Sequence, residues 1–125
     1  MILPEAGELL MPVTAIDGFR LGCLIDASTG MVLASLQNQE GSAAPIAAAG
    51  AADLINVLAL LNGKLATGEI LEDVMVTFSD SFFMVRPVRP DMEPRILLLV
   101  IADRQRTNLA MAHRSIRDFC EGFPS

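Results

Sequence analysis

Two short apolar runs of strand length lie close together near the start of the chain, over residues 19–26 and 31–36. The four residues between them are Ala27-Ser28-Thr29-Gly30, and Ser, Thr and Gly are favoured in tight reversals of the chain. The pattern therefore predicts a β-hairpin.

Three more segments have the apolar content and the length of strands, and they cover residues 72–79, 82–88 and 95–102. The first two are separated only by Asp80 and Ser81, which predicts a two-residue turn. Residues 96–101 are all apolar, and a strand without alternation is typically covered on both faces. We therefore expect this last strand to lie inside the sheet.

Helical spacing of apolar residues appears in three segments. A short N-terminal helix is predicted over residues 5–16, interrupted at Pro12, and a long central helix over residues 42–65, with Ser42 as its cap. An amphipathic helix is predicted over residues 104–121. The order helix, two strands, helix, three strands, helix predicts a layered α/β (α+β) fold, in which a five-stranded antiparallel sheet carries helices on both faces.

The predicted central helix is apolar almost all the way round, so one sheet cannot cover it. Its large aliphatic residues, with one glycine, form a face that we expect to pack on the sheet: Ile46, Gly50, Leu54, Val57, Leu58, Leu61 and Leu65. Most other positions are alanines. They are explained either by the high helix propensity of alanine or by close approach of a second helix, and we favour the helix of an identical subunit.

The predicted strand at residues 72–79 follows that helix in the chain and contains neither Lys nor Pro, which commonly protect an open sheet edge. Two such edges are able to pair. The strand and the central helix together predict a symmetric homodimer.

Composition supports this interpretation. The chain has 125 residues, 52% of them apolar, with a mean hydropathy of +0.47, which predicts one domain with apolar surface left over. The net charge of −6 disfavours nucleic acid as a partner.

No basic residue precedes the first apolar ones, so the start does not resemble a secretory signal and we expect a cytoplasmic protein. Residues 41–63 are long enough to span a bilayer, but Asp53 disfavours membrane insertion.

Residues that could perform catalysis are few and scattered. His113 is the only histidine, and Cys23 and Cys120 are far apart, so we expect a surface histidine, two buried thiols and no metal site. The Gly63-Lys64 pair lacks the other residues of a phosphate-binding loop. The sequence therefore predicts neither an enzyme nor a cofactor.

Four features taken together resemble the roadblock-type dynein light-chain family, in particular its short bacterial members related to regulators of polarity GTPases. The resemblance spans roughly residues 9–119, and the order and spacing of the features carry it. They are Gly18, Asp26-Ala27-Ser28-Thr29-Gly30-Met31-Val32-Leu33-Ala34, the alanine-rich segment 47–61, and Asp103-Arg104-Gln105-Arg106-Thr107-Asn108-Leu109-Ala110-Met111-Ala112.

The resemblance implies a profilin-like order of elements and a non-enzymatic homodimer. In that family the third strands pair edge to edge, the middle helices pack antiparallel, and the helical face receives a small Ras-like GTPase. Relatives in filamentous actinobacteria tend to be encoded beside a sensor kinase and a GTPase, so a sensor kinase complex is a further implied partner. The candidate dimer-interface residues are then Ala47, Ala51, Leu54, Ile55, Leu58, Val74, Val76 and Phe78, and the candidate partner-binding residues are Ala48, Ala52, Asn56 and Ala59.

A second interpretation is a small-molecule sensor or scaffold domain. It predicts a closed apolar pocket inside the monomer, near Cys23, Met84 and Met111.

Overall fold

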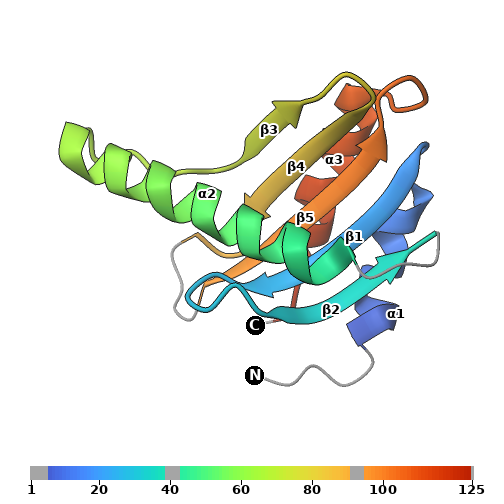
Figure 1. Cartoon of the computed structure of the whole chain (residues 1–125), viewed down its shortest axis with the longest axis horizontal. Coiled ribbons are helices and arrows are strands. Elements are labelled where there is room, and N and C mark those ends of the chain that lie inside the picture. The colour runs from blue at the N-terminus through green and yellow to red at the C-terminus, as the bar shows by residue number, and fades with distance from the viewer. Residues whose placement is uncertain (1–5, 39–42, 91–94, 125) are drawn as a thin grey trace.

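The computed structural model describes residues 6–38, 43–90 and 95–124, and its centre is a five-stranded sheet (Figure 1). All neighbouring strands are antiparallel, and their order is β2-β1-β5-β4-β3. This confirms the predicted fold class. The strands are β1 (Phe19–Asp26), β2 (Val32–Gln37), β3 (Val74–Thr77), β4 (Ser81–Pro87) and β5 (Ile96–Asp103).

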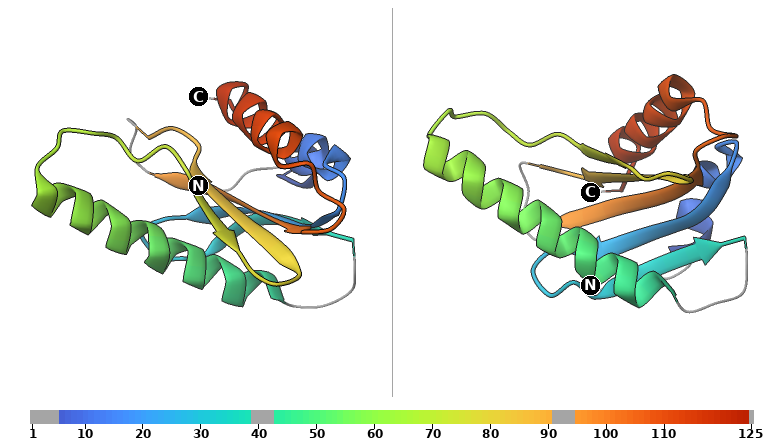
Figure 2. Two further views of the ribbon diagram at one scale, coloured as in Figure 1. Left: turned by 90° about the horizontal axis from the view of Figure 1, so that it is seen from above. Right: turned by 45° about the horizontal axis from the view of Figure 1, so that its top comes forward.

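Helices cover both faces of the sheet (Figure 2). The long helix α2 (Ala43–Leu65) lies on one face, while α1 (Ala6–Leu10), the 3₁₀ helix η1 (Met11–Ala15) and α3 (Leu109–Glu121) lie on the other. The predicted N-terminal helix is divided where Pro12 enters η1, because proline cannot donate the hydrogen bond that would continue an α-helix. The predicted cap of α2, Ser42, lies outside the described residues.

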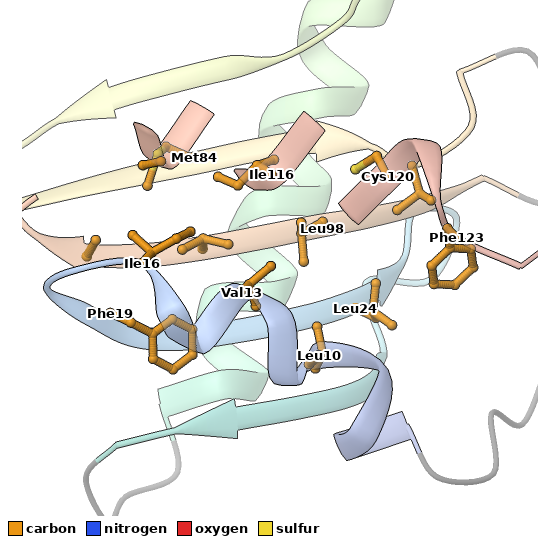
Figure 3. Close-up of a cluster of buried hydrophobic side chains, with 14 of the residues drawn as sticks. Leu10, Val13, Ile16, Phe19, Leu24, Met84, Leu98, Ile116, Cys120 and Phe123 are labelled. Atoms are coloured by element: carbon orange, nitrogen blue, oxygen red, sulfur yellow. The ribbon is translucent and has the colours of Figure 1, made fainter. Parts of the chain in front are cut away.

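The central strand β5 is buried on both sides, as its unbroken apolar run predicted. Leu97 and Leu99 contact the α2 layer, and Leu98 and Val100 belong to the cluster beneath α1, η1 and α3. In that second cluster Leu10 and Val13 pack toward Leu98 of the sheet, and Ile116 approaches from α3 (Figure 3). The sheet is therefore fixed from both faces.

Several element boundaries are displaced by a residue or two from the prediction, and β3 and the start of α3 differ most. β3 ends at Thr77, and the Phe78 N–H donates to the Ser81 carbonyl at 2.8 Å, which closes a two-residue turn at Ser79 and Asp80, one position earlier than predicted. α3 begins at Leu109 because the Asn108 side chain caps it, accepting from the Met111 N–H at 3.1 Å. A side-chain cap begins α3, and the backbone hydrogen bond of the turn ends β3, in both cases inside runs that apolar spacing alone would extend.

Gly18 occupies a backbone conformation that only glycine adopts easily, with φ +84°. A Cβ there would lie 2.6 Å from Thr107 Oγ1 and 3.1 Å from the Asp103 carbonyl oxygen. We expect Gly18→Ala to lower the free energy of unfolding by about 1–3 kcal/mol in urea denaturation. Gly63→Ala is the matched control: nothing lies within 4 Å of its added Cβ, so the same change should be neutral or stabilising. Equal losses in the two variants would contradict the explanation.

Candidate interaction surface

The side of α2 that faces the sheet is its alanine side. The buried residues of this helix are Ala44, Ala48, Ala51, Ala52 and Ile55. They pack against apolar residues of β1 and β5 such as Cys23, Ile25, Leu97 and Leu99. The prediction that the large aliphatic residues face the sheet is therefore wrong. Small side chains let the helix axis approach a sheet that already carries bulky residues, so both layers still reach close packing.

The side of α2 that faces away from the sheet carries large aliphatic residues, with the charged Asp53 and Lys64 exposed on the same side. Ile46 is 79% exposed, Val57 63% and Leu60 62%. We call these three residues the α2 crest. Gly50, which was also predicted to pack on the sheet, lies on this exposed side. Large aliphatic side chains on a water-facing helix are typical of a contact surface rather than of a solvated one.

The structure separates the candidate interface residues into a buried group and a half-buried group. Ala51 and Ile55, expected at the dimer interface, and Ala48 and Ala52, expected to bind a partner, are buried against the protein's own sheet. These four side chains make their contacts within the chain and are not presented on the surface of a single copy. The half-buried candidates are Ala47, Leu54, Leu58, Ala59, Val74 and Val76.

Asn56 and Phe78 have local contacts that the sequence did not predict. The Asn56 side chain donates to the Ala27 carbonyl at 3.1 Å and thereby links α2 to the β1–β2 hairpin. Phe78 is half exposed just beyond β3, and its ring packs edge-on against Phe83 at a centroid distance of 4.9 Å. Phe78 is therefore available as a candidate contact, whereas Asn56 already has a structural role.

α2 packs mainly over β1, β2 and β5, so the same face of the sheet is less covered at β3 and β4. Val76 and Phe83 are register partners and point to the α2 side, where both are only half buried. Beside them runs one flank of α2, which carries Leu54, Leu58, Leu61 and Leu65 at helical spacing. We call these four residues the leucine flank. We define the α2–β3 surface as Leu54, Leu58, Leu61, Leu65, Val74, Val76, Phe78 and Phe83.

The length of α2 is a further feature of the sequence that indicates this surface. A helix of 23 residues is about 35 Å long, whereas five strands span only about 20 Å and an eight-residue strand about 27 Å. The C-terminal part of α2 must therefore extend beyond the sheet, as Figure 1 shows. Leu61 and Leu65 lie in this part and are 51% and 64% exposed.

An open groove of about 370 Å³ separates the end of α2 from the segment that leads into β3. Leu58, Leu61 and Leu65 line one wall, and Ile70 and Leu71 belong to the returning segment. This segment is held by Asn62, whose side chain donates to the Glu69 carbonyl at 2.6 Å and accepts from the Thr67 hydroxyl at 2.9 Å. The groove extends the α2–β3 surface toward the end of the helix.

β3 is the last strand of the sheet, and within the residues that the structure describes its outer edge meets no other strand. This agrees with the open edge that the sequence predicted. Its outward polar backbone groups are able to pair with a further strand.

The displaced pKa values among the described residues have structural causes. Burial raises the pKa of the Cys23 thiol to about 12 and that of the Cys120 thiol to about 11, so both are protonated at neutral pH. Hydrogen bonds from the Ser28 hydroxyl and backbone lower the pKa of Asp26, which therefore serves the hairpin turn. Among the described residues, no group of three or more His, Cys, Asp and Glu is placed to hold a metal ion.

The closed pocket expected for a small-molecule sensor is not formed by the predicted residues. Cys23 and Met84 belong to clusters on opposite faces of the sheet, and Met111 is 67% exposed. That prediction is wrong because β5 and its neighbours fill the space between the helical layers. The larger hollows in the described part of the chain are open surface grooves.

α2 is also long and apolar enough to cross a membrane, with a mean hydropathy of 1.8 over an 18-residue window. That measure considers length and composition alone, and core helices of soluble proteins meet it too. Here the alanine side of the helix packs on the sheet. The crest and the leucine flank are the apolar parts of the helix that the sheet does not cover.

The arrangement of the sheet and helices matches solved structures of one type. A Roadblock/LC7 domain from Streptomyces avermitilis is 16% identical, with a TM-score of 0.79 over 97% of this chain and 93% of that chain. MglB in a tetrameric arrangement is 19% identical (TM-score 0.81; 97% and 90% covered). The gliding protein MglB from Thermus thermophilus is 17% identical (TM-score 0.72; 98% and 97% covered).

No model of a known protein family matches the chain, and no curated protein sequence matches it. The structural likenesses show that the chain has the roadblock/LC7 fold. The resemblance inferred from the sequence is thereby confirmed at the level of the fold.

Proposed function

We propose that this protein is a homodimeric, non-enzymatic adaptor that binds and regulates a small Ras-like GTPase. The observation that carries the proposal is the continuous apolar area formed by the α2–β3 surface beside an open strand edge. A single copy leaves this area in water although its core is already complete. Exposed aliphatic and aromatic side chains beside an unpaired strand edge suit a macromolecular contact.

In the proposed dimer, two β3 edges pair about a two-fold axis and the sheets become continuous. The leucine flanks of the two α2 helices then cover β3 and β4, the part of the sheet that α2 leaves open in a single copy. A two-fold contact uses the same surface on both copies, so one surface is sufficient. Leu54, Leu58, Val74, Val76 and Phe78 remain as proposed interface residues, joined by Leu61 and Leu65.

The α2 crest points away from the sheet and therefore stays outside this dimer contact. We assign it to the second partner, in place of the buried Ala48 and Ala52. The GTPase itself comes from the resemblance described above, as do the cytoplasmic location and a sensor kinase complex. In this proposal the adaptor supplies shape and apolar contacts rather than catalytic side chains.

Val57→Glu tests the crest. Placing a second carboxylate beside Leu60, one turn from Asp53, should weaken binding of a small Ras-like GTPase about tenfold or more, because a partner's apolar contact would then cover an added charge. Binding is measured by titration with the GTPase loaded with GTP or GDP, and we expect the wild type to distinguish the two forms.

Met111→Glu is the matched control for this test, since Met111 is similarly exposed but lies on the other side of the sheet. It should bind the GTPase as the wild type does. Equal weakening by both substitutions would remove the crest assignment, and failure of the wild type to bind any cellular GTPase would overturn the proposed partner.

A further inference from the structure

The outer wall of the groove beside α2 is the segment that leads into β3, and the chain's own contacts hold this segment at both ends. Asn62 fixes its start by donating to the Glu69 carbonyl at 2.6 Å. Near β3, the Asp73 carboxylate lies 2.8 Å from His113 Nε2 on α3 and 3.5 Å from Arg86 Nη1 on β4. The groove is therefore formed before anything binds, and a preformed site loses less conformational entropy on binding.

The inside of this groove is apolar and its rim is acidic. Leucines of α2 line one wall, and Ile70, in the returning segment, is 65% exposed. Glu69 and Glu72 also line the groove, and neither carboxylate forms an ion pair with another described residue. An apolar side chain that arrives with a positive charge beside it would complement both features.

Phe78, just beyond the other end of β3, is a side chain of this kind. Its ring is 50% exposed and packs edge-on against Phe83, which lies on the α2 side of the sheet. Phe78 does not line the groove of its own chain, because the five residue steps back to Asp73 span roughly 17 Å of extended chain. The ring therefore reaches such a groove only in a second copy.

The positive charge beside Phe78 belongs to Arg104. Arg104 Nη1 donates to the Phe78 carbonyl at 3.2 Å, and within the part of the chain that the structure describes Arg104 forms no ion pair. Arg20 also reaches this turn, but its guanidinium pairs with Asp103 at 3.4 Å. The turn's own acid is Asp80, whose carbonyl accepts from the Arg104 N–H at 3.1 Å. The Arg104 guanidinium is thus available to a glutamate at the groove rim, an attraction that sets orientation more than affinity.

Two-fold pairing of the β3 edges brings the ring of one copy to the groove of the other. An antiparallel pair centred on β3 (Val74–Thr77) places Met75 or Val76 opposite its own copy. Phe78 is three residues from the first of these and two from the second, so it falls opposite the start of the partner's β3, within residues 72–74. Residues that face each other across antiparallel strands lie on the same side of the sheet, and here that is the α2 side.

We propose that Phe78 of each subunit inserts into the groove of the other, between the leucines of α2 and Ile70, and that this reciprocal contact sets the register of the two β3 edges. The occupant of the groove is thus a second copy of this chain. Arg104 of the inserting subunit then lies near Glu72 at the rim. The inference rests on the homodimer of the proposed function and adds which residues meet in it, because each groove is filled only by a ring from the partner subunit.

Phe78→Ala tests the insertion in the full chain. Sedimentation velocity over a concentration series should show self-association weakened about ten- to thirtyfold, since the contact occurs twice in a two-fold dimer and buried aromatic anchors dominate interfaces. Leu61→Ala, in the groove wall, should have a similar effect. The two substitutions remove the same contact, so the double variant should associate little more weakly than either single variant.

Phe119→Ala is the matched control for Phe78→Ala. Phe119 is also a partly buried ring in an aromatic pair, with Phe123 at a centroid distance of 5.9 Å, but it lies on α3 behind the sheet. Its removal should leave self-association unchanged.

Cross-linking reports the contact in a second way. Differently tagged full-length chains carrying Phe78→Cys or Ile70→Cys are mixed and treated with a short bismaleimide, and we expect a covalent heterodimer. Phe78→Cys mixed with Met111→Cys should give none, because Met111 is exposed on the far side of the sheet. The native thiols do not compete, since burial raises the pKa of Cys23 to about 12 and that of Cys120 to about 11.

The outcomes separate this contact from the proposed homodimer. A wild type that sediments as a monomer would overturn both. A dimer that Phe78→Ala does not weaken, single effects that multiply in the double variant, or a dimer without the cross-link to Ile70→Cys would each overturn the insertion and leave the homodimer in place. If Phe78→Ala unfolded the chain because its ring also packs on Phe83, Ile70→Glu would decide, since this exposed position should weaken association when charged and an unchanged dimer would overturn the insertion.

Discussion

Ala48→Glu is expected to lower the free energy of unfolding by about 3–5 kcal/mol, a large share of the stability of an ordinary small domain. Ala48 is completely buried between α2 and the sheet. A carboxylate there would lose its water without gaining a partner, and its extra atoms would force the helix away from β1 and β5. Urea denaturation followed by circular dichroism measures the loss.

Ala49→Glu is the matched control, because it introduces the same residue one position along the same helix on the exposed side. Its effect should stay within about 0.5 kcal/mol, as for most surface substitutions. If the two variants were equally stable, α2 would not present its alanines to the sheet. The crest and the leucine flank would then lose their assignments.

Val76→Lys is expected to weaken self-association at least about a hundredfold, the largest effect predicted on assembly. In a two-fold contact through β3 the substitution acts twice, because each subunit carries one new lysine. The two charges approach each other across the contact, and both lose water. The monomer should keep its secondary structure, since Val76 is only half buried and lies on an edge strand. Sedimentation velocity over a range of concentrations measures the dimer.

Ser35→Lys is the corresponding control on the opposite edge of the sheet, where Ser35 is exposed on β2. It should leave self-association unchanged. If Ser35→Lys and not Val76→Lys dissociated the protein, the copies would associate through the β2 edge. A wild type that is monomeric at all concentrations would remove the proposed dimer altogether.

Most of the elements could be predicted from local patterns. β1 has the predicted bounds, and β5 differs by one residue at each end, because continuous apolar runs leave little choice of register or burial. The sheet edge at β3 was also foreseen from the lack of protecting residues. By contrast, the ends of β3 and α3 depended on hydrogen bonds such as that between Asn108 and Met111, whose effect an apolar pattern does not show.

The orientation of α2 was not predictable in the same way. Ile46 and Val57 are more hydrophobic than Ala48 and Ala52, so area burial within one chain favours the wrong face. The outcome depended on shape, because only the alanine side lets the helix approach Ile25 and Leu97 closely. The link between Asp73 and His113 was equally hidden, since it joins residues on different elements.

By itself, the sequence determined the elements, the class of fold and the excess of apolar side chains, because these depend on spacing and composition along the chain. Only the tertiary structure decided which of those side chains stay in water, since that depends on how two layers fit together. It moved the candidate surface from the alanines to the leucine flank, the crest and the edge of β3.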